Sequence, residues 1–296
     1  MAPLTVGRTW QYAVTGTVTK DYLDSSNNLQ TLSGPVTNAT LTREVSAAPD
    51  GVSGHFQITD TLTYTLQGMA PSVEVSTSVV NQAADNSVAV IGETKFNIQT
   101  STCTSDLSTL QTAPNATAPW LPGTFAVNTN LSGNTLLNFY NLAPLTYTVP
   151  PPSGTTEKAF QGTLTPGNAT LQTAVTDLGQ ESVSSSSGAA YTAWKSQTTE
   201  SDYWNIDGLY DVIGIGVPLP PGWIAQSKST KTLVEDWVPS MGAPVRSLLT
   251  FTETDNPVLS YTFTAPTYNV APTITYTFGP SLTKKESLAL ILTSWK

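Results

Sequence analysis

The residues best suited to chemistry gather in one stretch, 200–223, where carboxylates alternate with aromatic rings and no basic residue intervenes. Aromatic rings stack on sugar faces while carboxylates accept hydrogen bonds from sugar hydroxyls, and two carboxylates at a suitable separation can hydrolyse a glycoside. Carboxylate oxygens are also the ligands that calcium prefers. The stretch contains Glu200, Asp202, Tyr203, Trp204, Asp207, Tyr210, Asp211 and Trp223.

The same stretch has a simpler structural interpretation. Asp207-Gly208 is a typical two-residue hairpin turn, with Ile206 before it and Leu209-Tyr210 after it to enter the two strands. We favour the turn and keep sugar binding, calcium binding and glycoside hydrolysis open as alternatives.

Other catalytic groups are scarce. His55 is the single histidine, and the turn 49–51 just before it suggests a histidine at the start of a strand. Cys103 is the single cysteine, which excludes an internal disulfide and a cysteine-built zinc site. No Gly-x-Ser-x-Gly elbow and no nucleotide-binding glycine loop is present. The sequence therefore predicts no enzyme, no catalytic residue, no metal site and no cofactor, with calcium as the one alternative.

The charge balance excludes further classes. The net charge is −9, the isoelectric point is near 4.4, and only 11% of residues are charged. Arginine occurs only at Arg8, Arg43 and Arg246, whereas nucleic-acid binding needs clustered basic residues. No apolar run reaches the 18 residues or so that a membrane-spanning helix requires. We therefore expect neither nucleic acid as a partner nor a transmembrane segment.

The elements that position these residues are predicted to be strands. From Trp10, apolar side chains alternate with polar ones through Val18, and a second alternating run extends from Phe56 to Leu66. Asp60 interrupts the apolar face of the second run, which predicts a bulge, a sheet edge or a wet (solvent-exposed) strand end there.

A long hairpin is predicted near the C-terminal end. Leu259–Phe263 and Ile274–Phe278 are near copies joined by a proline-containing segment. Their aromatic stripe would pack in the core, line a cavity for an apolar ligand, or pair with a second subunit. We expect the final run, Ser287–Trp295, to be a closing strand.

The predicted fold is all-β, as one large antiparallel twisted sheet forming an open half-barrel or a sandwich. A phrase of proline, apolar residue, glycine and aromatic recurs at 3–10, 119–125 and 218–223, which suggests an internal pseudo-repeat whose aromatics anchor the core. We expect a single domain over 1–296, with a subdivision conceivable near 150–155 or 182–188.

Several phrases resemble uncharacterised bacterial secreted proteins and lipoproteins. The opening Pro-Leu-x-x-Gly-x-x-Trp-x-Tyr is similar to the start of their mature chains, and the run 237–246 resembles a Trp-x-Ala-Pro-Gly-x-Gly-x-Val-Arg signature. Ser240-Met241 departs from that signature, residues 247–286 look like an insertion, and the lipoprotein cysteine is absent. The resemblance implies an extracytoplasmic β-rich fold, loosely comparable to the half-barrels of lipoprotein carriers, and implies no activity.

The polar, lysine-poor composition likewise favours an extracytoplasmic location: secreted, periplasmic or at the cell surface. No signal peptide is visible, and we interpret the chain as a mature segment preceded by an initiator methionine.

Three hypotheses follow. The first is a non-enzymatic exported protein that binds an apolar or amphipathic small molecule in a curved sheet. The second is a structural surface protein that assembles with copies of itself by strand pairing, and the third is a carbohydrate-binding module or glycoside-active enzyme. The candidate ligand-binding residues are Tyr203, Trp204, Asp207, Tyr210, Asp211, Trp223, Trp237, Tyr261, Phe263, Tyr276 and Phe278.

Overall fold

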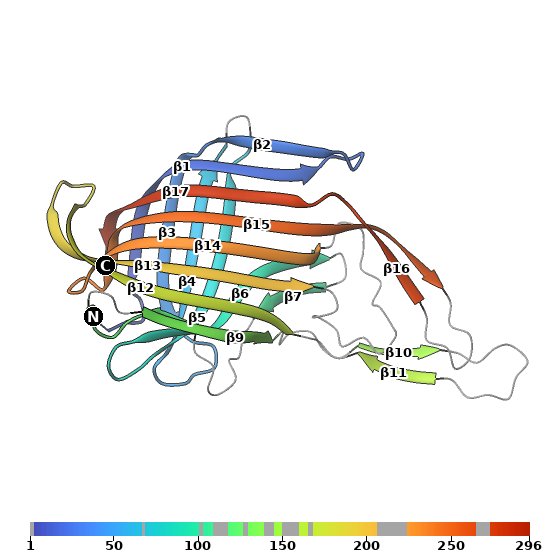
Figure 1. Cartoon of the computed structure of the whole chain (residues 1–296), viewed down its shortest axis with the longest axis horizontal. Helices are drawn as coiled ribbons and strands as arrows, with labels where there is room; N and C mark the ends of the chain where they lie inside the picture. The colour runs from blue at the N-terminus through green and yellow to red at the C-terminus, as the bar shows by residue number, and fades with distance from the viewer. Residues whose placement is uncertain are drawn as a thin grey trace, which may run out of the picture.

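The fold is all-β, as a computed structural model of the chain shows (Figure 1). The structure describes residues 3–66, 69–100, 103–108, 118–126, 130–138, 145–149, 160–164, 168–205, 224–264 and 273–296. Within these ranges every regular element is a strand, every strand pair is antiparallel, and no helix occurs.

The strands of the first half of the chain are β1 (Thr9–Leu23), β2 (Leu29–Pro35), β3 (Thr37–Ala47), β4 (His55–Thr65), β5 (Ser72–Gln82), β6 (Val88–Thr100), β7 (Cys103–Ser108), β8 (Ala118–Leu121) and β9 (Asn130–Asn138). The strands of the second half are β10 (Leu145–Val149), β11 (Phe160–Leu164), β12 (Asn168–Ser184), β13 (Ala190–Asn205), β14 (Ile224–Val238), β15 (Ala243–Thr264), β16 (Thr273–Phe278) and β17 (Leu282–Trp295).

One large sheet contains all of these strands except the separate pair β10–β11. Its order is β7-β6-β5-β4-β3-β1-β17-β15-β14-β13-β12-β9, with β2 on β1, β8 on β6 and β16 on β15. In Figure 1, β1, β17 and β12–β15 form a front layer, and β3–β6 pass behind it at a steep angle. The sheet thus folds over on itself and encloses an interior between its two halves.

The fold-over occurs in the middle of β1. The first half of β1 pairs with β3 and the second half with β2, so the sheet divides at Gly16. Gly16 has a φ of +139°, and a Cβ there would lie 2.0 Å from the carbonyl oxygen of Ser287. Only glycine fits this combination of backbone angle and close approach. The Val36 N–H donates to the Gly16 carbonyl over 3.0 Å and fixes the point where β3 departs.

The two ends of the sheet meet at a single seam among the described strands. Short β8 bonds to β6 at one end and packs against β12 and β9 at the other. Across this seam, Trp120 meets Trp237 edge to face at 6.2 Å between ring centroids, and Phe125 stacks on Trp194 at 6.0 Å. The Ala126 N–H donates to Asp177 over 3.1 Å. In the described part of the seam, ring packing and this polar contact therefore connect the ends, in place of a continuous strand ladder.

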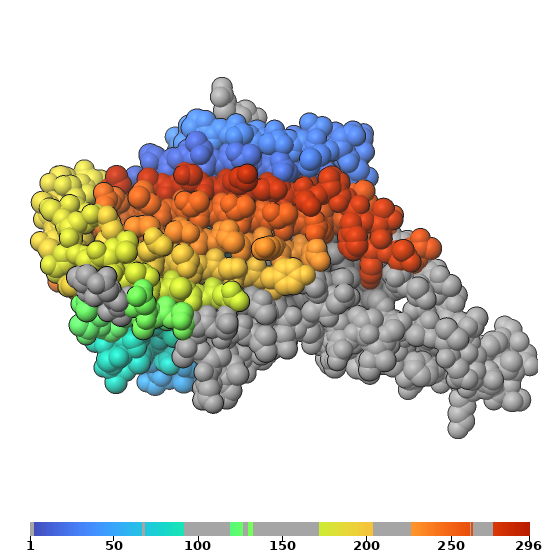
Figure 2. All heavy atoms as spheres, in the orientation of Figure 1, coloured from blue at the N-terminus to red at the C-terminus, as the bar shows by residue number. Residues whose placement is uncertain are grey.

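Buried apolar side chains fill the interior at the end of the sheet near both termini. The alternation from Trp10 to Val18 is confirmed, since Trp10, Tyr12, Val14 and Val18 are all at most 5% exposed. Trp10 and Phe125 are buried, so two of the three recurring phrases place an aromatic in the core. The third phrase, 218–223, lies outside the described residues. On the outside, Figure 2 shows the side chains of the front layer as parallel bands from β1 to β12.

Two expectations about strands are confirmed and one is wrong. β15 pairs with β16 in the predicted hairpin, with Tyr261 opposite Tyr276, and the closing run is strand β17. Of the bulge, sheet edge or wet end expected at Asp60, the bulge and the edge are wrong, because β4 is a central strand whose register is unbroken there. Asp60 points inward and accepts hydrogen bonds from Arg43 of β3. The alternation within one strand cannot reveal such a partner, because it lies on another strand. Of the two conceivable domain boundaries, 182–188 forms the tip of the β12–β13 hairpin and 150–155 is outside the described residues.

Candidate functional site

The inner face of the sheet changes character along its length, from apolar near the termini to polar at the other end. β13 shows this change most clearly, because its inward positions are Ser196, Thr198, Glu200 and Asp202, all at most 8% exposed. On the neighbouring strands, Thr173 of β12 pairs with Glu200, and Glu200 pairs with Lys231 of β14. Consecutive polar side chains at inward positions are costly unless they face water, a partner or a ligand.

A cavity of about 310 Å³ lies between the two layers at this polar end. The front layer contributes residues of β13, β14, β15 and β17, and the rear layer contributes residues of β3, β4 and β5. A smaller hollow of about 100 Å³ adjoins it, since both are lined by Asp60, Ser76, Glu200 and Lys231. The larger volume is at the lower end of the range of small-molecule sites.

The cavity wall combines apolar and charged side chains. Its apolar members are Leu41, Leu62, Val75, Leu249 and Phe251. Its charged members are the carboxylates Asp60, Glu74, Glu200, Glu253 and Glu286 and the ammonium groups of Lys231 and Lys284. Carboxylates therefore outnumber ammonium groups five to two along the wall of this cavity.

Arg43 neutralises one of these carboxylates, Asp60. Its guanidinium donates two hydrogen bonds to Asp60, both 2.8 Å long, and lies 3.6 Å from Glu235. Glu235 is 1% exposed and also accepts a hydrogen bond from the indole N–H of Trp237. Burial raises the pKa of Glu235, and the nearby guanidinium only partly offsets that effect. This network separates the apolar core from the cavity.

Lys284 joins the two layers at the opposite wall. Its ammonium lies 2.6 Å from a carboxylate oxygen of Glu74 and 2.8 Å from one of Glu286. Tyr64 donates to the other oxygen of Glu74 over 2.7 Å. Burial would lower the pKa of Lys284, but the two carboxylates outweigh burial and raise it, so the ammonium stays charged. Burial raises the pKa of Glu286 despite that pairing.

Two further carboxylates, Asp202 of β13 and Asp255 of β15, lie near each other on neighbouring parts of the sheet. Lys231 reaches Glu200 over 3.4 Å, and Ser229 donates to Asp202 over 2.6 Å. Burial raises the pKa of Asp255, and the negative charge of Asp202 raises it further.

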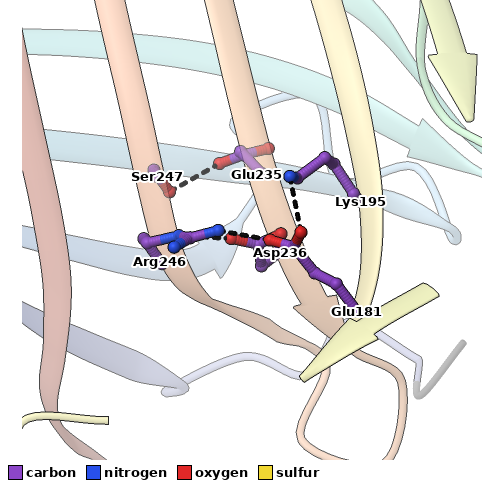
Figure 3. Close-up of polar contacts among 6 residues, drawn as sticks. All are labelled: Glu181, Lys195, Glu235, Asp236, Arg246 and Ser247. Atoms are coloured by element: carbon purple, nitrogen blue, oxygen red, sulfur yellow. Dashed lines mark hydrogen bonds and ion pairs between the residues drawn. The ribbon is translucent and has the colours of Figure 1, made fainter. Parts of the chain in front are cut away.

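A second charged cluster lies on the opposite face of the front layer (Figure 3). Asp236 pairs in register with Lys195 and Arg246, one residue along from the inward Glu235. Arg246 donates to Asp236 over 2.6 Å and also to Glu181, and Lys195 donates to Glu181 over 2.7 Å. Each cation in this cluster has a carboxylate partner. These ion pairs connect the neighbouring strands β12, β13, β14 and β15 on the outer face.

A shallow hollow of about 480 Å³ lies along β12, β13 and β14. Besides small side chains such as Ser132, Ala174 and Thr199, its lining includes Glu200 and Lys231, which also line the interior cavity. Its described lining contains no aromatic ring, so we place the candidate site in the interior.

The sequence-predicted ligand residues whose side chains the structure describes do not gather in one place. Trp237 is 2% exposed in the apolar core, and Tyr203 is 41% exposed on β13, where Gln226 donates to its hydroxyl. Tyr276 and Phe278 stack on each other on the β15–β16 hairpin, and Phe278 is half exposed. The structure describes the strands but not the side chains at Trp204, Tyr261 and Phe263. Asp207, Tyr210, Asp211, Trp223 and the proposed turn at 207–208 lie outside the described residues.

His55 and Cys103, the single histidine and the single cysteine, each lie at the start of a strand. His55 is the first residue of β4, as predicted, and its Nδ1 lies 2.7 Å from a carboxylate oxygen of Asp50 in the preceding turn. Cys103 is the first residue of β7.

Sequence reasoning missed most of the cavity wall. The sequence pattern did not single out four charged residues of the wall, because each lies in a strand that mixes polar and apolar side chains without a recognisable motif. They are Glu74, Glu253, Lys284 and Glu286. One signal was present at Asp60, which occupies an apolar-face position between Ile58 and Leu62. A charge on the buried face of a strand indicates either an edge or an interior site.

A search of protein-family models, curated proteins and solved structures finds no match to this chain. The resemblance to bacterial secreted proteins therefore stays a prediction. Over the part of the chain that the structure describes, no helix has the length and apolar character to cross a membrane.

Proposed function

We propose that this protein is a non-enzymatic, exported binding protein that holds an amphipathic small molecule between the two halves of its curved sheet. The observation that carries the proposal is the interior cavity of about 310 Å³, whose wall combines leucine and phenylalanine side chains with charged groups. Such a wall suits a ligand that has both apolar and polar groups.

Extracytoplasmic location belongs to the same proposal. It is supported by the acidic, lysine-poor composition and by the resemblance of the opening phrase to mature secreted chains. A folded chain released by osmotic shock or found in culture medium, and absent from the cytosolic fraction, would agree with this location.

The binding proposal is tested by filling the cavity. Ser76 of β5 lines both interior hollows, so S76F should reduce the binding of the neutral fluorescent probe N-phenyl-1-naphthylamine at least tenfold. T61F, on the outward side of neighbouring β4, is the matched control and should bind the probe as the unmodified chain does. Equal binding by both variants would place the probe elsewhere and contradict the proposal. Native mass spectrometry of protein from its natural host would then identify any resident ligand.

Self-assembly by strand pairing is a second candidate, because one specific edge favours it. β2 pairs with β1 on one side and with none of the described strands on its other side. Its sequence LQTLSGP carries no charge, although charged residues are the usual protection of a sheet edge. Light scattering at high concentration should show multimers that L32K in β2 abolishes; a monomer at all concentrations would exclude this candidate.

The carbohydrate hypothesis depends on Asp207 and Asp211, which the structure does not describe. It remains a prediction, and D207N/D211N compared with the unmodified chain on a glycan array would test it.

A further inference from the structure

We propose that the interior cavity has a closing flap, which is the part of β6 from residue 95 to residue 100 together with β7. The flap closes by pairing with the open edge of β5. This inference rests on the proposed binding function and adds how a ligand enters the cavity and is retained there. It combines an open strand edge beside the cavity, a bend in β6 at that edge, and matching residue patterns on the two strands.

The first step is a strand edge that borders the cavity. β5 pairs with β4 from Ser72 to Asn81, but its ladder with β6 begins only at Thr77. Residues 72–76 therefore have no strand on their second side among the described elements. Three consecutive residues at this edge, 74–76, line the cavity, so the cavity reaches the edge of β5 as well as its inner face.

The second step is the course of β6 next to that edge. β6 pairs with β5 from Val88 to Thr94 and continues as a strand to Thr100, where β7 is its one described neighbour. The β6–β7 register passes directly from Thr94 to Phe96, which is the irregularity of a β-bulge at Lys95. A bulge bends its strand and increases the local twist. β6 thus turns away from β5 at the residue where the open edge begins, and the bulge is the hinge of the flap.

The third step is the apolar pattern of the two segments. Val73 and Val75 are 62% and 60% exposed, which makes them the most exposed large apolar side chains in the described part of the chain. Continuing the present β5–β6 register beyond its last pair places Phe96 opposite Val75 and Ile98 opposite Val73. Aromatic and β-branched residues in such cross-strand positions stabilise a sheet. The segment that diverges therefore carries the residues that would cover the two exposed valines.

The polar residues of the two segments match in the same register. Glu74 and Ser76 belong to the cavity wall, and the continued register places Asn97 opposite Glu74 and Lys95 opposite Ser76. Both strands would then present polar residues toward the cavity and apolar residues to the outside. Neither segment contains proline, so each residue has a backbone N–H for the extended ladder.

The structure shows the open arrangement, and the continued ladder is the closed one. Closure adds strand pairing along 72–76 and completes the cavity wall on that side. A ligand that contacts the closed wall shifts the population toward closure, because it binds that arrangement better than the open one. Open chains admit the ligand and closed chains retain it.

The test is a pair of double-cysteine variants in a C103S background, where only the introduced cysteines can react. V75C/F96C should form a disulfide under mild oxidation. The entry rate of N-phenyl-1-naphthylamine, measured by stopped-flow fluorescence, should then fall at least tenfold and recover on reduction. V75C/N97C is the matched control, because neighbouring residues of a strand point to opposite faces and its cysteines cannot meet in the proposed register. It should neither crosslink nor change the entry rate.

The outcomes separate the flap from the binding function. Equal crosslinking of both variants, or of V75C/N97C alone, would overturn the register and the flap with it. A V75C/F96C disulfide that leaves probe entry unchanged would mean that ligands enter elsewhere, and the gating role would be wrong. If the unmodified chain binds no probe, the proposed function fails, while the crosslinking pattern still decides the strand pairing.

A second measurement covers the case in which V75C/F96C does not fold. Hydrogen exchange on the unmodified chain should become at least tenfold slower in residues 72–76 when the probe is saturating, because closure adds backbone hydrogen bonds there. Exchange in β14, which already has strands on both sides, is the internal reference. Unchanged exchange in 72–76 with the probe bound would contradict the flap.

Discussion

At the level of single residues, the interior depends on paired charges. Arg43 is the central example, because its guanidinium serves both Asp60 and Glu235 at the boundary between core and cavity. Removing one member of a buried ion pair leaves an uncompensated charge, which costs far more than the pair itself contributes.

We therefore expect R43M to lower the free energy of unfolding by roughly 3–5 kcal/mol, as is usual for a broken buried pair. Chemical denaturation followed by tryptophan fluorescence measures this change. The triple variant R43M/D60N/E235Q removes the stranded charges as well and should recover a large part of the loss. A triple variant as unstable as R43M would show that lost packing, and not charge, is responsible.

Glu235 gives a prediction about pH. Burial raises the pKa of its carboxyl above the ordinary value of 4.5, so the folded chain retains this proton after the unfolded chain has released it. The group therefore costs stability as pH rises from about its ordinary pKa through its raised folded pKa. E235Q, which cannot ionise, lacks this cost.

The difference in unfolding free energy, E235Q minus unmodified chain, should become more positive as the pH rises above the ordinary carboxyl pKa of 4.5. Denaturant titrations at a series of pH values measure it. A difference that does not change with pH would mean that Glu235 titrates alike in the folded and unfolded chains.

At the level of elements, one glycine decides where the sheet folds over. Gly16 combines a φ of +139° with a backbone approach that leaves no room for a Cβ. G16A should lower the free energy of unfolding by about 1–3 kcal/mol from backbone strain alone, with overpacking against β17 adding to it. Thermal unfolding measures the loss. G34A in β2 is the matched control, since nothing lies within 4 Å of its added Cβ and its effect should be small.

The elements also show how far sequence reasoning extends. Alternation from Trp10 to Val18 and from Phe56 to Leu66 correctly predicted strands, because one buried face imposes a period of two. The cavity could not be predicted in this way, because its wall comes from strands far apart in the chain. Glu74 and Lys284, for example, are 210 positions apart and meet only when the sheet folds over.

At the level of the whole molecule, the seam should be the least stable part of the sheet. Among the described residues, short β8 forms a strand ladder with β6 alone and only lies against β12 and β9, whereas β14 has a full strand ladder on both sides. Local opening is easiest where few backbone hydrogen bonds hold an edge. Native-state hydrogen exchange should therefore be fast in residues 118–126 and slow in β14 and β15. Equal protection in both regions would contradict this expectation.

The position of β17 has a consequence for how the chain acquires its structure during synthesis. β17 lies between β1 and β15, and so joins the strands made first to those made last. While the ribosome is still adding residues before 282, β3–β6 and β12–β15 have no strand to connect them through β1. The central pairing of this sheet is thus necessarily a late event, and chaperones that shield exposed strand edges would act on the nascent chain until that event.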